Sequence, residues 1–329
     1  MTNLGGLLKG QTLRLRSGQA RASAAHNRKF ALESFLVSVL TVLFIADICG
    51  KAGRQATAHL TEVLKEKFKV DYVIANVENA AGGFGITPEM SRKIFTYGVN
   101  LQTSGNHIWD RMAIQEYLDL EPKLLRPDNY PKGAPGGGVY IDQVGDVKIA
   151  TMNLMGRTYM SNIDCPFKKA SKILNAAGKE TNIIFLDFHA EATSEKQAML
   201  YHLDSRVSAI VGTHTHVQTA DEKITENGTA YITDTGMSGA YDSVIGMEVG
   251  PSLGRFLTGM PKRFTAAKDD VKISGVVVGI DKKTGKAVSI QRYRYDFDIE
   301  KIEESKFAIL GYKPKRSTLV HLQEDDNDN

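Results

Sequence analysis

Short apolar runs alternate along the chain with segments whose apolar residues recur at helical spacing, and this pattern begins near residue 39. The apolar runs are typical of buried strands. They predict strands over residues 40–46, 72–76, 100–103, 147–153, 182–187, 209–212 and 230–233. The helical spacing predicts helices over residues 54–67, 87–97, 114–118, 167–177 and 194–203. Helices thus alternate with strands, which is the pattern of an α/β fold.

The C-terminal part has a different pattern. Residues 272–280 and 286–295 are separated by the turn sequence 281–285 and predict an antiparallel hairpin. We expect this hairpin to extend one sheet of a two-sheet core. The chain has no internal repeat, which argues against a solenoid.

Both ends of the chain differ from the rest. Residues 1–37 are rich in Gly, Arg, Ser, Ala and Gln, and we expect a disordered extension or translated sequence upstream of a later true start. Residues 38–315 are expected to form a single domain, and residues 316–329 a polar tail. A signal peptide is the alternative for the apolar run 35–46, because Arg21, Arg28 and Lys29 precede it, but no small-x-small cleavage site follows. The same run is too short to span a bilayer, so a buried first strand is the preferred interpretation.

Composition narrows the class of protein. The 329 residues are 42% hydrophobic and 24% charged, with a formal net charge of +3, so whole-chain charge gives no strong nucleic-acid-binding signal. The two cysteines, Cys49 and Cys165, are too few for a secreted disulfide framework. We therefore expect free thiols and a cytoplasmic protein without a membrane span.

Polar side chains follow five of the predicted strands. In open α/β sheets ligands bind beyond the carboxyl ends of the strands, so these positions favour a common site. The residues are Asp47, Glu78, Asn79, Asn106, His107, His189, His214 and His216.

Carboxylate, amide and imidazole ligands together suit Mn, Fe or Zn ions. A single ion could not coordinate all of these side chains, whereas two ions that share a bridging carboxylate could. Alone, Asp47 is more often a turn or cap residue and Asn106–His107 a loop. Gly212-Thr213-His214-Thr215-His216 is more specific, since residues i and i+2 of an extended segment face the same side.

At this point the sequence resembles a known family. Asp47, Gly105-Asn106-His107, His189 and the Gly-Thr-His-Thr-His segment 212–216 resemble the spaced signature of calcineurin-like metallophosphoesterases. Over about residues 40–298 the chain is similar to the YmdB-type bacterial 2′,3′-cyclic-nucleotide phosphodiesterases. The longer segments that carry this likeness are 44–54, 75–83, 105–110, 187–196 and 213–221.

The resemblance implies a four-layer α/β/β/α sandwich and a dinuclear site that is often iron-containing, with manganese or zinc as alternatives. Carried over by position, Asp47, Asn79 and His216 would hold the first metal and Glu78 would bridge both. Asn106, His189 and His214 would hold the second, and His107 would be the general acid. The chain departs from the broader superfamily at Cys49, where a metal-binding His is common, and at Glu78, where an Asp is common. We interpret Cys49 as a packed thiol, with a metal ligand as the alternative.

Some residues have weaker signals. Arg126, in a Pro- and Gly-rich segment, and Arg157, after a predicted strand, are candidates for contact with substrate phosphate. Asp187 and Asp234 are candidates to orient ligand histidines, with loop capping as the alternative. Trp109 either stacks on a base or packs beneath the site, and packing is preferred.

With this resemblance we expect an enzyme that hydrolyses 2′,3′-cyclic nucleotides at the 2′ ester bond, by attack of hydroxide held on the metals with His107 as acid. One alternative is a broader phosphomonoesterase or phosphodiesterase. Another is a nucleotide-binding regulator with incidental turnover. Homo-oligomers stay open, because no surface feature of the sequence decides the oligomeric state.

Overall fold

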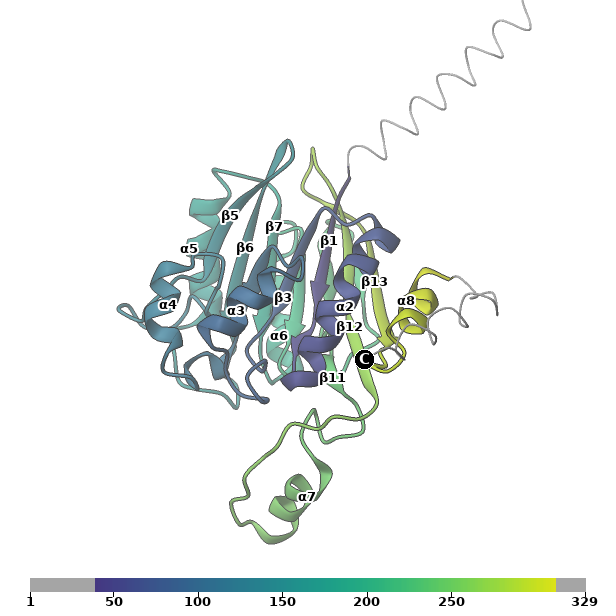
Figure 1. Ribbon diagram of the computed structural model, residues 1–329. Coiled ribbons are helices and arrows are strands. Elements are labelled where there is room, and N and C mark those ends of the chain that lie inside the picture. Colours follow the sequence, from purple (N-terminus) through teal and green to yellow (C-terminus); the bar gives the residue numbers. More distant parts are fainter. Residues whose placement is uncertain (1–38, 312–329) are drawn as a thin grey trace, which may run out of the picture. The chain divides into compact units, whose positions relative to one another are not determined.

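The computed structural model describes residues 39–311, which form two β-sheets with helices on their outer faces and one long excursion (Figure 1). The expectations for residues 1–37 and 316–329, and the domain boundaries at 38 and 315, lie outside these residues.

The first sheet has seven strands and is built around β1, the first predicted strand. β1 pairs in parallel with β3, and β3 with β4. The predicted hairpin is present as β12 and β13, which pair antiparallel and extend this sheet, as expected. The strands are β1 (Val39–Ile45), β2 (Asp47–Ile48), β3 (Tyr72–Asn76), β4 (Leu101–Thr103), β11 (Met237–Ala240), β12 (Val271–Asp281) and β13 (Ala287–Asp296).

The second sheet has six strands in the order β5-β6-β7-β8-β10-β9. Its four central strands run parallel, and the two edge strands β5 and β9 run antiparallel to their neighbours. The strands are β5 (Val139–Val144), β6 (Val147–Met155), β7 (Ile184–His189), β8 (Ala209–Thr213), β9 (Lys223–Ile224) and β10 (Ala230–Ile232).

All five predicted helices are present. α3 begins as expected, with Thr87 Oγ1 accepting a hydrogen bond from the Met90 N–H at 3.3 Å and a proline in the first turn. α2 begins four residues before its predicted start, and Gly53 lets it pack closely, because a Cβ there would lie 2.1 Å from the Ser238 carbonyl oxygen. The helices are α2 (Gly50–Phe68), α3 (Pro88–Phe95), α4 (Ile114–Leu120), α5 (Pro166–Ala177), α6 (Thr193–Leu203), α7 (Val249–Thr258) and α8 (Ile302–Leu310), with a 3₁₀ helix η1 (Asn106–Trp109).

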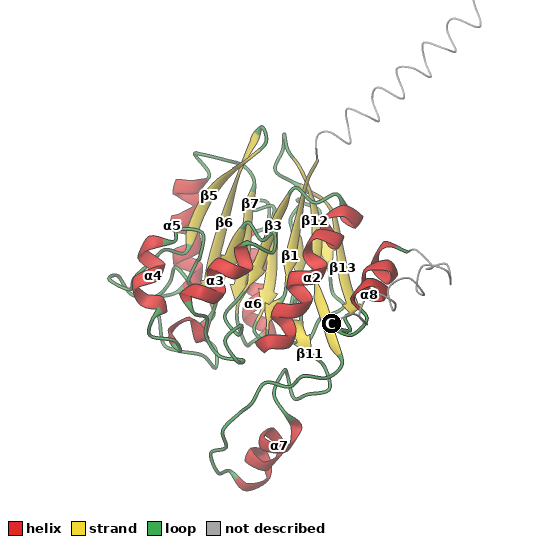
Figure 2. Ribbon diagram, in the orientation of Figure 1, coloured by secondary structure: helices red, strands yellow, loops and turns green. Residues whose placement is uncertain are grey.

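The alternation of side chains in β1 shows how the layers pack. Phe44 points between the sheets and stacks on Phe185 of β7, with ring centroids 5.9 Å apart. Leu43, on the opposite face, packs against Leu60 of α2. Leu186 of β7 packs outward against α5 and α6. The order is therefore helix, sheet, sheet, helix, and the predicted four-layer α/β/β/α sandwich is confirmed (Figure 2).

The structure also contains elements that the sequence pattern did not predict: the edge strand β5, the short strands β2, β9 and β11, and the helices α7 and α8. α7 lies in a long excursion between β11 and β12, below the sheets in Figure 1. No helix among residues 39–311 is both long enough and apolar enough to cross a membrane.

Candidate metal centre

The strand-end residues meet at one edge of the two sheets, as the sequence pattern predicts. In the first sheet Asp47 follows β1 and begins β2, and Glu78 and Asn79 follow β3. η1 begins with Asn106, and two residues separate it from the end of β4. β7 ends at His189, and the loop after β8 carries His214 and His216. Their polar atoms form two adjacent groups.

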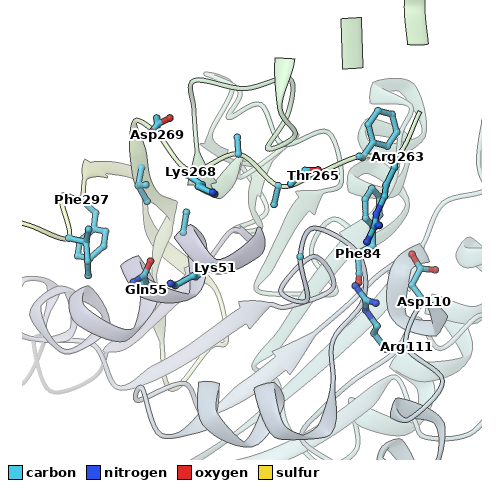
Figure 3. Close-up of a pocket in the computed structure, with 17 residues that line it drawn as sticks. Lys51, Gln55, Phe84, Asp110, Arg111, Arg263, Thr265, Lys268, Asp269 and Phe297 are labelled. Carbon is cyan, nitrogen blue, oxygen red and sulfur yellow. The ribbon is translucent and has the colours of Figure 1, made fainter. Parts of the chain in front are cut away.

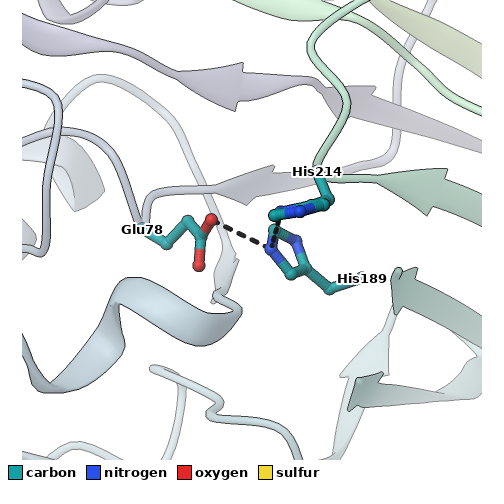
Figure 4. Close-up of side chains that lie close together, drawn as sticks. All are labelled: Glu78, His189 and His214. Carbon is teal, nitrogen blue, oxygen red and sulfur yellow. Dashed lines mark hydrogen bonds and ion pairs between the residues drawn. The ribbon is translucent and has the colours of Figure 1, made fainter. Parts of the chain in front are cut away.

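The first group surrounds Nε2 of His189 (Figure 4). This nitrogen lies 3.0 Å from Glu78 Oε1, 3.0 Å from Asn106 Oδ1 and 3.1 Å from His214 Nδ1. Glu78, His189 and His214 each direct one candidate ligand atom into a space no more than 4.8 Å across. Glu78 and His189 are fully buried, so little water reaches these atoms.

A hydrogen-bond relay from the second sheet sets the tautomer of His189. Thr213 Oγ1 donates to Asp187 Oδ1 at 2.7 Å, so its single proton is used there. His189 Nδ1 lies 2.9 Å from the same hydroxyl and must be the donor. Nε2 of the neutral ring therefore keeps its lone pair and faces Glu78 and Asn106, which is the arrangement that metal-binding histidines adopt.

The arrangement of these nitrogen and oxygen atoms suits binding of a metal ion better than hydrogen bonding among the side chains themselves. Glu78 Oε1 is buried and has no partner of hydrogen-bond geometry among residues 39–311. Several lone pairs converging at separations of about 3 Å repel one another without a cation, and about 3 Å is the edge of an octahedron with ligands about 2.1 Å from its centre. Gly105 leaves the space open, because a Cβ there would lie 2.2 Å from His189 Nε2 and 2.4 Å from Glu78 Oε2.

The second group consists of Asp47, Asn79 and His216. His216 Nδ1 donates to the Ile245 carbonyl at 2.9 Å, so Nε2 faces Asp47 Oδ2 and Asn79 Oδ1, both at 3.4 Å. Asn79 donates its amide N–H to the Gly83 carbonyl at 2.9 Å, which turns its oxygen inward. Asp47 is fully buried, and its Oδ1 has no partner within the described part of the chain. This set also offers oxygen and imidazole ligands to a cation.

The electrostatics of the protein alone show the same demand for positive charge. Burial disfavours the charged form of Glu78, but the imidazole of His189 lowers its pKa to about 2. Burial likewise opposes a charged His216, yet contact with Asp47 raises its pKa to about 9. Burial and the charge of His189 lower the pKa of His214 to about 3. Against the effect of burial, nearby carboxylates also raise the pKa of His189, so His189 and His216 stand where a cation would otherwise balance those carboxylates.

His214 and His216 reach the site for a different reason from the one expected. β8 ends at Thr213, and the two histidines have φ of 99° and 63°, so the segment is not extended. Left-handed backbone at a non-glycine residue costs of order 1 kcal/mol and is tolerated where the surroundings hold it. Asp234 provides that hold, since its Oδ2 accepts from both N–H and Oγ1 of Thr215. The two imidazoles consequently enter different groups instead of sharing one face.

His107 lies at the rim of this edge, with 27% of its side chain exposed. Its Nδ1 is 2.8 Å from Asp110 Oδ2, and its backbone N–H donates to Glu78 Oε2 at 3.0 Å. Asp110 orients the ring so that Nε2 faces away from it. His107 lines a cavity of about 330 Å³ together with residues of both groups and with Phe84, whose ring meets the imidazole edge-on at 5.0 Å.

The remaining candidates lie elsewhere. Cys49 is packed with Met237 and Met247, and burial raises the pKa of its thiol to about 12, which agrees with a packed thiol. Arg126 is buried, and its guanidinium donates to the carbonyls of Pro127, Ala134, Pro135 and Gly136, so it holds its own loop instead of lining the cavity.

Arg157 is exposed, and its backbone N–H donates to Glu195. It does not line the cavity beside the metal ligands, and neither does Trp109, which packs edge-on against Tyr130 at 5.3 Å. For Trp109 the packing interpretation is therefore the one that the structure favours.

Sequence reasoning did not give roles to three residues that contact the site. Asp110 orients His107, Thr213 orients His189, and Glu191 Oε2 lies 3.1 Å from His214 Nε2. Asp110 follows His107 by three residues, a spacing that one turn of helix brings together, and so had a local signal. Thr213 had none, because its partners are 24 and 26 residues away.

Comparison with known proteins places the chain in a family. The family model described as YmdB-like protein matches residues 43–293. A 2′,3′-cyclic-nucleotide 2′-phosphodiesterase of Bacillus subtilis (strain 168) is 46% identical over 253 residues, which are 77% of this chain and 96% of that protein.

Solved structures agree with this placement. A hypothetical protein from Thermus thermophilus is 37% identical with a TM-score of 0.74, covering 79% of this chain and all of that one (100%). A structure described as a novel phosphatase from Mycoplasma pneumoniae is 32% identical with a TM-score of 0.75, covering 83% of this chain and 99% of that one.

A more distant likeness concerns the fold alone. The NAD nucleotidase of Haemophilus influenzae has a TM-score of 0.50 at 13% identity, covering 88% of this chain and 67% of that one. With the four layers described above, it supports a fold of the calcineurin-like metallophosphoesterase type. From the family model and the relatives, the chain is a member of the YmdB-like family of phosphoester-hydrolysing enzymes.

Proposed function

We propose that this enzyme hydrolyses 2′,3′-cyclic nucleotides at the 2′ ester bond with two metal ions held at the sheet edge. The observation that carries the proposal is the pair of adjacent groups of inward-facing lone pairs. Asp47, Asn79 and His216 would hold one ion, and Asn106, His189 and His214 the other. Glu78 would contact both, and its buried Oε1 is the oxygen that lacks a hydrogen-bond partner within residues 39–311.

Metal ions held there would lower the pKa of a coordinated water and neutralise charge on the phosphoryl oxygens. Iron or manganese fits the mixed oxygen and nitrogen ligands, and zinc is an alternative. The relative from Bacillus subtilis is named for this reaction, which supports the choice of substrate. The cavity of about 330 Å³ beside the two groups is at the lower end of the range for small-molecule sites.

His107 would act as the general acid. With Nδ1–H held by Asp110, the doubly protonated ring would pass its Nε2 proton to the 2′ oxygen as the bond from phosphorus to that oxygen breaks. Oxygen from water enters at phosphorus, and the product is a 3′-phosphate with a free 2′ hydroxyl. The exposed rim position gives His107 access to a bound nucleotide.

The remaining proposals concern the context of the enzyme. We propose that residues 38–315 form one domain and that the protein works in the cytoplasm. The two free thiols, Cys49 and Cys165, favour a reducing compartment. Homo-oligomers are compatible with this function.

The test is hydrolysis of four substrates by purified protein loaded with Mn²⁺ or Fe²⁺: 2′,3′-cyclic AMP, 3′,5′-cyclic AMP, an aryl phosphodiester and an aryl phosphomonoester. We expect preference for 2′,3′-cyclic AMP and its loss in Asp47→Ala. Activity on the monoester alone would keep the metal centre and overturn the substrate. Bound metal without any hydrolysis would favour a nucleotide-binding regulator.

The metal count is tested separately by elemental analysis. Two ions per chain are expected in the wild type, and fewer in His189→Ala and His216→Ala, which remove one ligand from each group. A wild-type content of one ion would contradict the dinuclear centre. His107→Ala should retain both ions and lose turnover, so wild-type turnover in this variant would remove its role as acid.

A further inference from the structure

A second and larger cavity adjoins the proposed metal centre. It has a volume of about 1200 Å³ and lies between the start of α2, the loop of Phe84, and the segment 263–271 that precedes and enters β12 (Figure 3). At about 330 Å³, the metal-site cavity is much smaller. Small-molecule sites usually have volumes of about 300–1,000 Å³, so the second cavity is larger than a mononucleotide needs.

The charged side chains of this groove are mainly cationic. Lys51, Arg263 and Lys268 line it, are exposed, and form no ion pair within residues 39–311. Figure 3 places Arg263 toward the Phe84 end of the groove and Lys51 and Lys268 toward the other end. The carboxylates in the lining are Asp110, which contacts His107, and Asp269. The groove therefore carries an excess of unpaired positive charge along its length.

Aromatic side chains connect the groove with the metal-site cavity. Phe84 and Phe264 line both cavities and stack with centroids 6.3 Å apart and planes inclined by 25°. Phe84 also meets the ring of His107, so the shared wall begins beside the proposed acid. Cationic side chains that follow a groove, combined with aromatic rings, are the usual features of single-stranded nucleic-acid sites.

We infer that the preferred substrate of this enzyme is an oligoribonucleotide whose 3′ end is a 2′,3′-cyclic phosphate. The inference rests on the proposed function and extends it. Such ends form when a 2′ hydroxyl of RNA attacks its own phosphodiester. The cyclic phosphate would occupy the metal centre, and the preceding nucleotides would pass Phe84 and Phe264 into the groove, where Lys51, Arg263 and Lys268 meet their phosphates. The reaction is unchanged: water adds at phosphorus, the 2′ oxygen leaves with a proton, and a terminal 3′-phosphate remains.

Kinetics test the inference directly. We compare kcat/KM for 2′,3′-cyclic AMP and for a tetra-adenylate with a terminal 2′,3′-cyclic phosphate, using the Mn²⁺-loaded full chain. The wild type should prefer the tetranucleotide by tenfold or more, through a lower KM. The triple variant Lys51→Gln, Arg263→Gln, Lys268→Gln should lose that preference and keep the wild-type kcat/KM for 2′,3′-cyclic AMP.

A matched control removes three exposed lysines elsewhere: Lys168→Gln, Lys172→Gln and Lys179→Gln, on and just after α5 against the second sheet. This control should behave as wild type. Equal kcat/KM for both substrates in the wild type, or an unchanged preference in the groove variant, would overturn the inference and leave the proposed function intact. Absence of hydrolysis of both substrates would instead count against the proposed function.

Binding gives a readout that needs no turnover. Fluorescence anisotropy follows a labelled tetra-adenylate with a 3′-phosphate end on the full chain in EDTA. Contact with three phosphates predicts that log K falls with log salt concentration at a slope of about −2, which is roughly a 15- to 20-fold loss between 50 and 200 mM. The groove variant should have a slope near zero. Equal slopes in both proteins, or equal displacement of the probe by a heptaglutamate peptide, would overturn the inference.

Discussion

At the scale of single residues, the proposed acid is oriented by a neighbour three positions along the chain. Asp110 Oδ2 lies 2.8 Å from His107 Nδ1, while the backbone N–H of His107 donates to Glu78 at 3.0 Å. The ring and its backbone are therefore fixed from two sides, one of which is a ligand candidate. A carboxylate in this position accepts the Nδ1 proton and so turns Nε2 toward the substrate.

Asp110→Asn should reduce kcat on 2′,3′-cyclic AMP by roughly 10- to 100-fold with little change in KM, because an amide orients the ring less firmly than a carboxylate does. The metal content should be unchanged, since Asp110 contacts no ligand candidate side chain. Steady-state kinetics and elemental analysis check both statements. Glu89→Gln, at an exposed position of α3, is the control and should match wild type. A raised KM at unchanged kcat would contradict the positioning role of Asp110.

Thr213 has the corresponding role for a metal ligand. Its hydroxyl links His189 Nδ1 to Asp187 Oδ1, at 2.9 and 2.7 Å. Thr213→Val keeps the shape and removes the hydroxyl, so the ring loses the acceptor that fixes its tautomer. Loss of such a partner typically weakens metal binding by about 10- to 100-fold. Titration with Mn²⁺ followed by calorimetry measures the change. Equal affinity in wild type and variant would show that Thr213 does not orient the ligand.

The sequence predicted the candidate metal ligands better than the residues that orient them. Asp47, Glu78 and His189 were identifiable because each follows an apolar strand, and parallel strands end at a common edge. Thr213 was not, because its partners come from another strand. Left-handed backbone at His214 was not predicted either, since no glycine or turn sequence marks it. Such features depend on contacts between segments that are distant in sequence.

At the scale of elements, the strongly periodic segments were predicted and the context-dependent ones were not. β3 has the predicted bounds, because its five residues are all buried and all but the last, Asn76, are hydrophobic. β11 has the sequence MSGA, in which three of the four residues are small and carry no strand signal. It forms a strand because its backbone pairs with β2 on one side and β12 on the other. α7 contains Gly250, Pro251 and Gly254, which are poor helix formers, so its sequence VGPSLGRFLT does not predict a helix.

Arg126 illustrates the same limit for a loop. The sequence suggested a cation that meets phosphate, whereas the guanidinium donates to four carbonyls of residues 127–136. A Pro- and Gly-rich segment has few backbone partners of its own, and a buried arginine supplies the missing donors. A sequence pattern cannot distinguish these two uses of an arginine, because both place it in a polar loop.

The segment between β8 and β10 depends on Asp221. This carboxylate accepts from Thr219 Oγ1 at 2.6 Å, from the Thr233 N–H at 3.1 Å and from the Thr233 hydroxyl. Burial acts in the opposite direction, but these hydrogen bonds lower the pKa of Asp221 below its usual value. A folded-state pKa below the unfolded value means that the stabilisation is present above about pH 4 and is lost as pH falls through the folded pKa.

Asp221→Asn should therefore lower the free energy of unfolding at pH 7 by about 1–2 kcal/mol, a typical loss for hydrogen bonds to a charged acceptor. The difference from wild type should shrink below pH 4, where the wild-type carboxyl also becomes neutral. Urea unfolding at pH 7 and pH 3 measures both values. Glu226→Gln, in the same segment between β8 and β10, is the control. A loss of equal size at both pH values would mean that the charge of Asp221 is not what stabilises the segment.

At the scale of the whole molecule, the proposed metal ligands come from both sheets. Asp47 and Glu78 follow strands of the first sheet, and His189 and His216 end or follow strands of the second. Between the sheets lies an apolar core that includes Phe44 and Phe185, while the edge above it holds buried carboxylates and imidazoles. Without cations, that edge relies on protonated histidines to balance its carboxylates.

Metal ions bound between the two sheets should consequently raise the free energy of unfolding of the whole folded chain. A ligand present at 100 times its Kd adds about 2.7 kcal/mol to the free energy of unfolding. For a chain of this size that raises Tm by roughly 4–5 °C. Differential scanning calorimetry with EDTA and with Mn²⁺ measures the difference. Asp47→Ala on the first sheet and His216→Ala on the second should each lose most of it, whereas Cys165→Ser should not. If either ligand variant kept the full increase, the ions would not link the two sheets through these residues.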